Sequence, residues 1–229
     1  QLTSLDLSNN TALTTLYCYY NQLTSLDLSN NTALTTLRCY NNQLTSLDVS
    51  QNTALTTLYC YNNQLTSLDV SNNTALTTLR CYSNQLTSLD VRNGNNTNMS
   101  TSSYNVSFTN NPQLYCIDVD DVAWADTNWT VANGNISYWN SFSNDCQNET
   151  YGCADSLAAN YDPIATLNDG SCDYGYTYVP DDNFENYLEI NGMGDGIAGN
   201  DSVLTVNIRF LTSLSVGWKN ISDLTGIED

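Results

Sequence analysis

The chain has 229 residues, with 24 Asp or Glu against five Lys or Arg and no His, so its formal net charge at pH 7 is −19. This charge argues against nucleic acid and anionic membranes as partners, because both would repel the protein. No apolar run is long enough to cross a bilayer, so membrane insertion is not expected, and the many acidic residues are candidates for cation binding.

The N-terminal part of the chain repeats one 21-residue unit. Residues 1–21 read QLTSLDLSNNTALTTLYCYYN, and QLTSLD recurs at Gln22, Gln43, Gln64 and Gln85. A fixed period of this size indicates a solenoid, because one unit has too little apolar surface to fold alone and buries it against its neighbours.

Each unit contains two half-turns of the form LxxLxLxxN. In the second unit these positions are Leu23, Leu26, Leu28 and Asn31, followed by Leu34, Leu37, Cys39 and Asn42. The pattern points alternate residues of a short strand inward and turns the chain at an Asn, whose side chain bonds backbone groups. We therefore expect a mainly β fold with two short parallel strands per coil.

The repeated unit resembles the leucine-rich repeats, specifically the irregular bacterial class with the pattern LxxLxCxxNxLxxLDLxxN. Residues 34–52 match this pattern, with Val49 in place of the last Leu. The resemblance covers residues 1–91 and implies a leucine-rich repeat solenoid in an extracellular protein, secreted or on a bacterial cell surface. It implies no particular ligand, because repeats of this type serve many partners.

The eight cysteines form two groups. Four follow the repeat period at an inward position, about 4.8 Å apart, and are expected to be a stack of buried free thiols: Cys18, Cys39, Cys60 and Cys81. A metal site among them is not expected, because the chain has no His and no CxxC spacing.

The repeat ends after Asp90, and the polar residues 95–105 predict a loop or an irregular last coil. From Asn110 the sequence resembles the C-terminal cap of secreted bacterial leucine-rich repeat proteins, which gives a solenoid over residues 1–94 and a cap over residues 95–148. A cap is required, because the last coil otherwise exposes apolar side chains and open strand edges. Its covering residues are predicted to be Leu114, Ile117, Val119, Val122, Trp124, Trp129 and Phe142, with a disulfide between Cys116 and Cys146.

Residues 149–176 resemble a short linker module of the same kind of surface protein, GC…NYDP…DGSC. A segment this short and polar needs a staple, so Cys153 and Cys172 are expected to pair. Its oxygen-bearing side chains form a candidate calcium site: Asp155, Asn160, Asp162, Asn168, Asp169 and Asp173. The alternative is a disulfide-pinned turn in which Asn and Asp serve only as turn formers.

Residues 177–229 resemble the N-terminal cap and first coil of a following repeat domain. An amphipathic helix is predicted over residues 181–190, with Phe184, Tyr187, Leu188 and Ile190 inward. The order of parts is thus coils, C-terminal cap, linker and N-terminal cap, which leads us to expect a processed product or a piece of a longer protein.

This order predicts a structural or adhesive protein, either a head-to-tail filament subunit or one unit of a tandem surface array. The cap of one copy, or of an adjacent repeat module, would cover the first coil of the next. The predicted assembly residues are Leu2, Leu5, Leu13, Phe184, Leu188, Leu211, Leu214 and Val216. The seam lacks about half a coil after Ile227, Glu228 and Asp229.

Outward positions form columns, because each coil places the same residue above its counterpart. One column contains Tyr19, Tyr40, Tyr61 and Tyr82, and another alternates as Tyr17, Arg38, Tyr59 and Arg80. We define both columns together as the Tyr/Arg face. It is a candidate site for a surface glycan or protein, through stacking and charge-assisted hydrogen bonds. In the alternative, these side chains only stabilise the sheet.

A third column contains like charges about 4.8 Å apart, at Asp6, Asp27, Asp48, Asp69 and Asp90. Bound cations, raised pKa values, hydrogen bonds from Ser and Thr, or screening by salt would each relieve the repulsion.

No catalytic constellation is present, since the chain has no His, no GxSxG motif and no phosphate loop, so an enzyme is not expected. Two Asp-Ser-apolar triplets, at Ser156 and Ser202, resemble a bacterial O-glycosylation signal, although chance explains three residues equally well.

Overall fold

The computed structural model describes residues 1–209, 211 and 213–227. The chain forms two compact units, one containing Gln1–Tyr151 with Ala165–Gly170 and the other Gly152–Ile164 with Ser171–Asp229. We call them the solenoid unit and the C-terminal unit. Residues of the expected linker module, 149–176, fall in both units.

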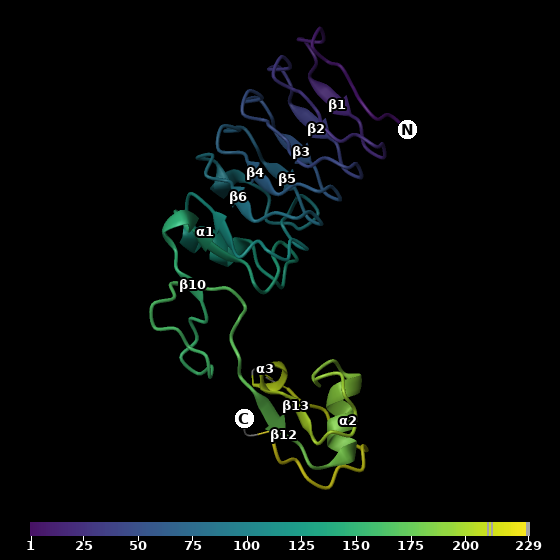
Figure 1. Cartoon of the computed structure of the whole chain (residues 1–229), viewed down its shortest axis with the longest axis vertical. Coiled ribbons are helices and arrows are strands. Elements are labelled where there is room, and N and C mark those ends of the chain that lie inside the picture. The colour runs from purple at the N-terminus through teal and green to yellow at the C-terminus, as the bar shows by residue number, and fades with distance from the viewer. Residues whose placement is uncertain (210, 212, 228–229) are drawn as a thin grey trace. The chain divides into compact units, whose positions relative to one another are not determined.

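The solenoid unit is built on a parallel sheet that takes one strand from each successive coil (Figure 1). Its strands are β1 (Thr15–Tyr17), β2 (Thr36–Arg38), β3 (Thr57–Tyr59), β5 (Thr78–Arg80) and β7 (Val106–Ser107). The register is fixed by the repeat, since Leu16 pairs with Leu37 and Leu37 pairs with Leu58. The predicted parallel leucine-rich repeat solenoid is confirmed.

A second parallel sheet contains β4 (Ser67–Asp69), β6 (Ser88–Asp90), β8 (Cys116–Asp118) and β9 (Ser141–Ser143). The equivalent segments 4–6, 25–27 and 46–48 are described residues but form no strand, so the earlier coils have one strand each rather than two. The second sheet forms where four short strands pair in succession. Isolated pairs of very short strands are only marginally stable, which explains why the earlier segments form none.

The core of the solenoid unit is a column of Leu, Val and Cys side chains from the inward repeat positions. Leu37, Leu58 and Leu79 are fully buried, as are Cys39, Cys60 and Cys81, while Cys18 is 4% exposed. The periodic cysteines are free thiols, and the disulfides link Cys116 to Cys146 and Cys153 to Cys172.

Two rows of buried asparagines join consecutive coils. In the first Asn ladder (Asn31, Asn52, Asn73 and Asn93), the amide nitrogen donates to backbone oxygens of the preceding coil. In the second Asn ladder (Asn42, Asn63, Asn84 and Asn111), it also donates to a carbonyl of its own coil. In the second Asn ladder, the residue before each member has a left-handed backbone conformation, with φ between 53° and 56° at Asn41, Asn62, Ser83 and Asn110.

Residues 95–148, the expected cap, contain helix α1 (Val122–Asn128) and aromatic residues that pack on the solenoid core. Asp121 caps the helix by accepting a hydrogen bond from the Trp124 backbone N–H at 3.0 Å. The predicted residues Leu114, Ile117, Val119, Trp129 and Phe142 are buried, and Val122 and Trp124 pack against the same core. Phe108, which the sequence analysis did not select, is also fully buried and meets Trp129 edge to face.

The C-terminal unit contains the antiparallel pair β12 (Tyr176–Tyr178) and β13 (Ser202–Leu204), with helices α2 (Asp182–Ile190) and α3 (Thr205–Ile208). Its small core contains Val179, Phe184, Leu188, Val203 and Ile208. Asp181 caps α2, as its acidic N-terminus predicts, but Ile190 is 76% exposed, because it is the last residue of the helix.

The remaining elements are short. They are the 3₁₀ helices η1 (Asn96–Asn98) and η2 (Cys146–Asn148), together with the paired strands β10 (Tyr151–Gly152) and β11 (Leu167–Asn168). No helix within the described ranges is both long and apolar enough to span a membrane.

Replacing Asn63 by Ala is expected to lower the free energy of unfolding by about 3 kcal/mol, because each buried polar group left unpaired costs roughly 1–3 kcal/mol. Asn63 donates to the oxygens of Cys39 and Cys60 and accepts from the Leu44 N–H at 3.0 Å. Urea unfolding measures the change. The neighbouring exposed Gln64→Ala is the control, and an equal effect of both variants would contradict the role of the ladder.

The four periodic thiols are expected to resist alkylation at pH 8 in the folded protein and to react after denaturation. The thiolate is the reactive form, and burial raises the pKa of Cys18 to about 11 and the pKa values of Cys39 and Cys60 well above their ordinary value. Mass spectrometry of labelled, non-reduced digests tests this. A bridge between a periodic cysteine and a cap cysteine would show that the inward register is wrong.

Candidate functional site

The tyrosine column is a continuous stack of rings on the outer side of the first sheet. Tyr19 stacks on Tyr40 at 4.6 Å between ring centroids, and Tyr40–Tyr61 and Tyr61–Tyr82 stack at 4.4 Å, with interplanar angles of 10° or less. The spacing follows from the strands beneath, which set one ring per coil. Each inner ring therefore has both faces covered by its neighbours and presents only its edge and hydroxyl outward.

The alternating column places a guanidinium between tyrosine rings. The Cζ atom of Arg38 lies 4.9 Å from the Tyr17 ring centroid and 5.0 Å from that of Tyr59. Arg80 lies 5.4 Å from the Tyr59 centroid and 5.0 Å from that of Tyr82. These cation–π contacts hold both guanidinium groups beside the tyrosine rings of the column.

The electrostatics of the Tyr/Arg face differ from those of the rest of the chain. Arg92 pairs with Asp90 at 2.6 Å and Arg209 with Asp155 at 3.2 Å, whereas in the described part of the chain Arg38 and Arg80 form no ion pair. Their Nε atoms are buried without a hydrogen-bond partner there. Burial also raises the pKa of Tyr61, so its phenol stays a neutral hydrogen-bond donor at neutral pH.

This arrangement decides what the face offers to a ligand. Sugar rings commonly stack on aromatic faces, but the inner tyrosine faces are already occupied. What remains is a strip of hydroxyl groups and ring edges, with two guanidiniums that have no carboxylate opposite them. Such a strip suits a ligand that accepts hydrogen bonds and carries negative charge.

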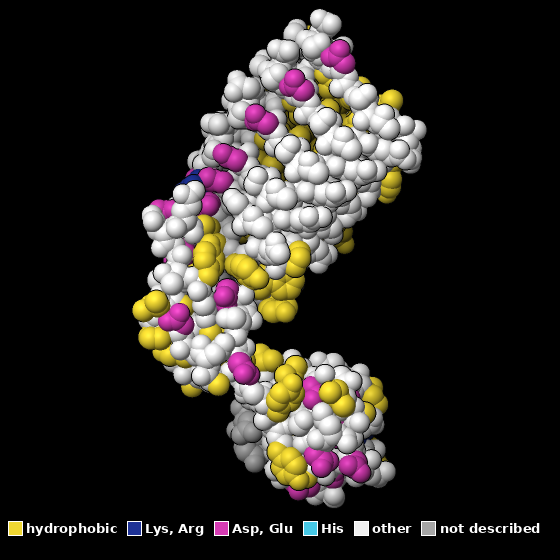
Figure 2. Space-filling view, in the orientation of Figure 1, with side chains coloured by type: hydrophobic (Ala, Val, Ile, Leu, Met, Phe, Trp, Pro, Cys, Tyr) yellow, Lys and Arg dark blue, Asp and Glu magenta, His cyan; other side chains and the backbone are white. Residues whose placement is uncertain are grey.

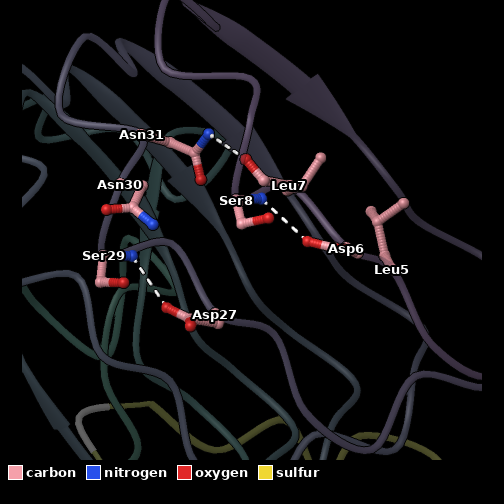
Figure 3. Close-up of a pocket in the computed structure, with 8 residues that line it drawn as sticks. All are labelled: Leu5, Asp6, Leu7, Ser8, Asp27, Ser29, Asn30 and Asn31. Carbon is pink, nitrogen blue, oxygen red and sulfur yellow. Dashed lines mark hydrogen bonds between the residues drawn. The ribbon is translucent and has the colours of Figure 1, made fainter.

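The aspartate column follows one edge of the solenoid unit, where Figure 2 shows a spaced row of acidic side chains. Each carboxylate accepts a hydrogen bond from the backbone two residues on, as in Asp6 with Ser8 and Asp27 with Ser29, both 3.0 Å (Figure 3). These bonds lower the pKa of Asp6, Asp27 and Asp48. Raised pKa values are therefore not how the repulsion is relieved, and local hydrogen bonds contribute instead.

The pockets between neighbouring aspartates are small. The pocket that Asp6, Asp27 and Asn31 line with other residues has a volume of about 40 Å³, which leaves room for only a few water molecules (Figure 3). A larger open pocket of about 290 Å³ lies at the cap, lined by Pro112, Tyr115, Tyr138, Trp139, Asp169 and Gly170. No sequence pattern predicts this pocket, because its residues come from segments outside the repeat.

The candidate calcium residues of the linker already have hydrogen-bond donors. Asp162 and Asp173 accept from backbone N–H groups of Ile164 and Gly175, at 3.0 and 2.8 Å. Asn168 accepts likewise from Gly170, and Asn160 from Asp173. Asp155 binds the Tyr174 hydroxyl and Arg209. Turn formation accounts for the bonds of Asp162, Asn168 and Asp173 to the backbone two residues on, whereas Asp155 binds more distant side chains. Calcium binding at the linker stays a prediction.

The predicted assembly residues divide into two groups. Leu2 is 50% exposed, and Leu5 and Leu13 are only partly buried. Phe184 and Leu188 are 2% and 0% exposed within their own unit, so the prediction that they cover another coil is wrong. Leu214 and Val216 also pack on that core, whereas Leu211 is 40% exposed. Glu228 and Asp229 at the proposed seam lie outside the described residues.

The two glycosylation triplets lie in different settings. Ser156 is exposed in a turn. Ser202 is not in a loop, because it lies in β13 and pairs with Tyr178.

Comparison with known proteins identifies the repeat itself. Residues 11–52 and 53–96 match the family model "Leucine Rich repeats (2 copies)". No curated protein matches the chain. Among solved structures, the functional domain of InlJ from Listeria monocytogenes, described as including a cysteine ladder, is 35% identical in sequence. That match covers 52% of this chain and 29% of the other, with a TM-score of 0.42.

Proposed function

We propose that this leucine-rich repeat solenoid is the recognition module of an extracellular adhesive protein, and that its Tyr/Arg face binds an acidic segment of a partner protein. The observation that supports this most directly is the pair Arg38 and Arg80, which form no ion pair among the described residues of a chain with a net charge of −19. Since acidic groups are abundant elsewhere on the chain, two uncompensated guanidiniums on one flat face favour an anionic ligand.

The spacing of the guanidiniums favours an extended polypeptide. Arg38 and Arg80 are two coils apart, which corresponds to about 9.6 Å at the strand spacing. In a peptide with the extended polyproline II conformation, side chains three residues apart lie on the same side and are separated by about 9.3 Å, so such a peptide parallel to the solenoid axis would reach both. An acidic glycan is the competing ligand. It is the weaker candidate, because the inner tyrosine faces on which its sugar rings would stack are already covered.

The proposed location rests on the disulfides Cys116–Cys146 and Cys153–Cys172, which persist in oxidising compartments such as the outside of the cell. A binding role without catalysis fits a solenoid whose repeated surface is a flat strip of polar groups.

Arg38→Ala is expected to weaken binding of a peptide with Glu at every third position by about fivefold, corresponding to roughly 1 kcal/mol for one partly exposed charge pair. Raising the salt concentration should weaken wild-type binding and remove most of this difference. Fluorescence anisotropy with the labelled peptide measures both effects. Lys219→Ala, which removes one positive charge from the C-terminal unit, is the matched control.

An equal loss in Lys219→Ala would mean that only net charge matters, and the Tyr/Arg face would be rejected. A glycan array is read in parallel. If neutral or acidic glycans bind and Tyr61→Ala removes that binding while Tyr104→Ala does not, the ligand is a glycan. Tyr104 is an 81% exposed tyrosine away from the columns.

A second proposal, end-to-end packing, is supported by the open edge of the first coil. Leu2 is 50% exposed, whereas its counterparts Leu23 and Leu44 are fully buried by the coil before them. A preceding repeat module or another copy would cover this edge equally well. Since Phe184 and Leu188 are already buried, only Leu211 among the predicted cap residues is substantially free to contribute.

Electron microscopy of the purified chain is expected to show filaments if copies cover this edge, and Leu2→Asp should abolish them. Leu211→Asp tests whether the exposed Leu211 of the predicted N-terminal cap takes part in the same contact. A monodisperse monomer at all salt and calcium concentrations would exclude self-assembly and leave packing against a repeat module of a longer protein.

A further inference from the structure

Three carboxylates converge in the C-terminal unit, at the junction between β12, α2 and β13. One carboxylate oxygen from each of Asp182, Glu185 and Asp201 lies within 4.8 Å of the other two. Asp182 and Glu185 are three residues apart on α2 and so share one face of the helix. Asp201 directly precedes β13 and completes the group from the other side of the junction.

The backbone holds Asp201 in place independently of its side chain. Its carbonyl oxygen accepts a hydrogen bond from the Val179 N–H at 2.8 Å. The neighbouring Asn200 side chain accepts from Ser202 and donates to Asp195, at 3.0 and 2.9 Å. Asp201 itself is left-handed, with φ 57°, a conformation that an Asp or Asn adopts more readily than most residues.

Glu185 is the central member, because it is buried and incompletely bonded. Its side chain is 1% exposed, and its Oε1 atom accepts a hydrogen bond from the Asn200 N–H at 3.0 Å. The Oε2 atom is buried and has no hydrogen-bond partner among the described residues. A buried carboxylate oxygen without a donor is unfavourable, so this atom points to a ligand that the chain itself does not supply.

No basic side chain in the described part of the chain neutralises the group. The ion pairs found there involve Arg92 and Arg209, and neither reaches these three carboxylates. Lys219, the other cation of this unit, lies 5.7 Å from the centre of the Tyr187 ring. Like charges this close repel unless a cation lies between them.

We propose that Asp182, Glu185 and Asp201 bind a calcium ion. Carboxylate oxygens are hard ligands, and two ligands of one Ca²⁺ lie up to about 4.8 Å apart when each Ca–O distance is about 2.4 Å. Mg²⁺ demands near-ideal octahedral geometry and gives up its water reluctantly, so it is usually held by only one or two carboxylates rather than three. The ion would supply the missing partner of Glu185 Oε2 and join the start of α2 to the start of β13.

The affinity follows from the number of protein ligands. Ca²⁺ takes six to eight oxygens, so three carboxylates leave the remaining positions to water. We therefore expect a dissociation constant of about 10⁻⁴ to 10⁻³ M, the range of extracellular calcium modules. Binding to the folded unit alone would raise its thermal stability with calcium concentration.

Calorimetric titration of CaCl₂ into the full chain tests the site. The wild type should show one saturable site, and Asp182→Asn and Asp201→Asn should each weaken binding at least tenfold. Asn at position 201 keeps the left-handed backbone accessible, so this variant is expected to fold. The linker variants Asp162→Asn and Asp173→Asn are the matched controls and should leave calcium binding at Asp182, Glu185 and Asp201 unchanged.

Glu185→Gln separates ion binding from a purely structural role. Gln keeps an oxygen for the Asn200 N–H but removes the buried charge, so with chelator the C-terminal unit should unfold at the wild-type temperature or higher. Calcium should then raise the unfolding temperature of the wild type and leave that of Glu185→Gln unchanged.

Three results would overturn the proposal. The first is the absence of saturable calcium binding at calcium concentrations up to about tenfold above the expected dissociation constant. The second is binding that survives Asp182→Asn, Asp201→Asn and Glu185→Gln but disappears in the linker variants. The third is magnesium binding as tight as calcium binding, which would exclude the calcium assignment.

Discussion

The hydrogen bonds of the two Asn ladders are the constraint on which the solenoid depends. In every coil the backbone turns at the edge of the core, where its carbonyl and amide groups are buried away from water and need hydrogen-bond partners. Asn63 meets this need by joining groups of two consecutive coils with one side chain. The Asn amide combines two N–H donors with an acceptor on one short side chain, whereas a hydroxyl has a single donor, so Ala, Leu or Asp at this position would leave groups unpaired.

The ladders also determine the outer surface. Because they hold successive coils in one register, any residue repeated every 21 positions becomes a straight column of identical groups. Tyrosine tolerates this arrangement, since rings at strand spacing stack. For aspartate, each carboxylate has its own backbone donor, such as Ser29 for Asp27, and these hydrogen bonds help to offset the repulsion. The same register therefore produces an apolar core, an aromatic strip and a charged edge.

Sequence alone predicted what the repeat encodes and little of what lies outside it. The inward Leu and Cys positions and the Asn turns follow from the period, and the covering residues around Trp129 follow from the resemblance to a C-terminal cap; the structure buries both sets. The second strand of the early coils depends on pairing with neighbours, which periodicity does not report. The burial of Phe184 within its own unit and the convergence of Glu185 with Asp201 depend on how α2 meets β13, a long-range contact with no signal in spacing.

The alternation of Tyr17, Arg38, Tyr59 and Arg80 gives the solenoid a true period of two coils, and each half of the matched repeat region, 11–52 and 53–96, contains one arginine of the face. Loss of a single internal coil, such as the one that carries Tyr59, would place Arg38 directly beside Arg80 and replace an attractive contact with a repulsive one. Loss or gain of a 42-residue pair would preserve every contact. Gene duplications that lengthen such a protein without weakening it are therefore expected to come in pairs of coils.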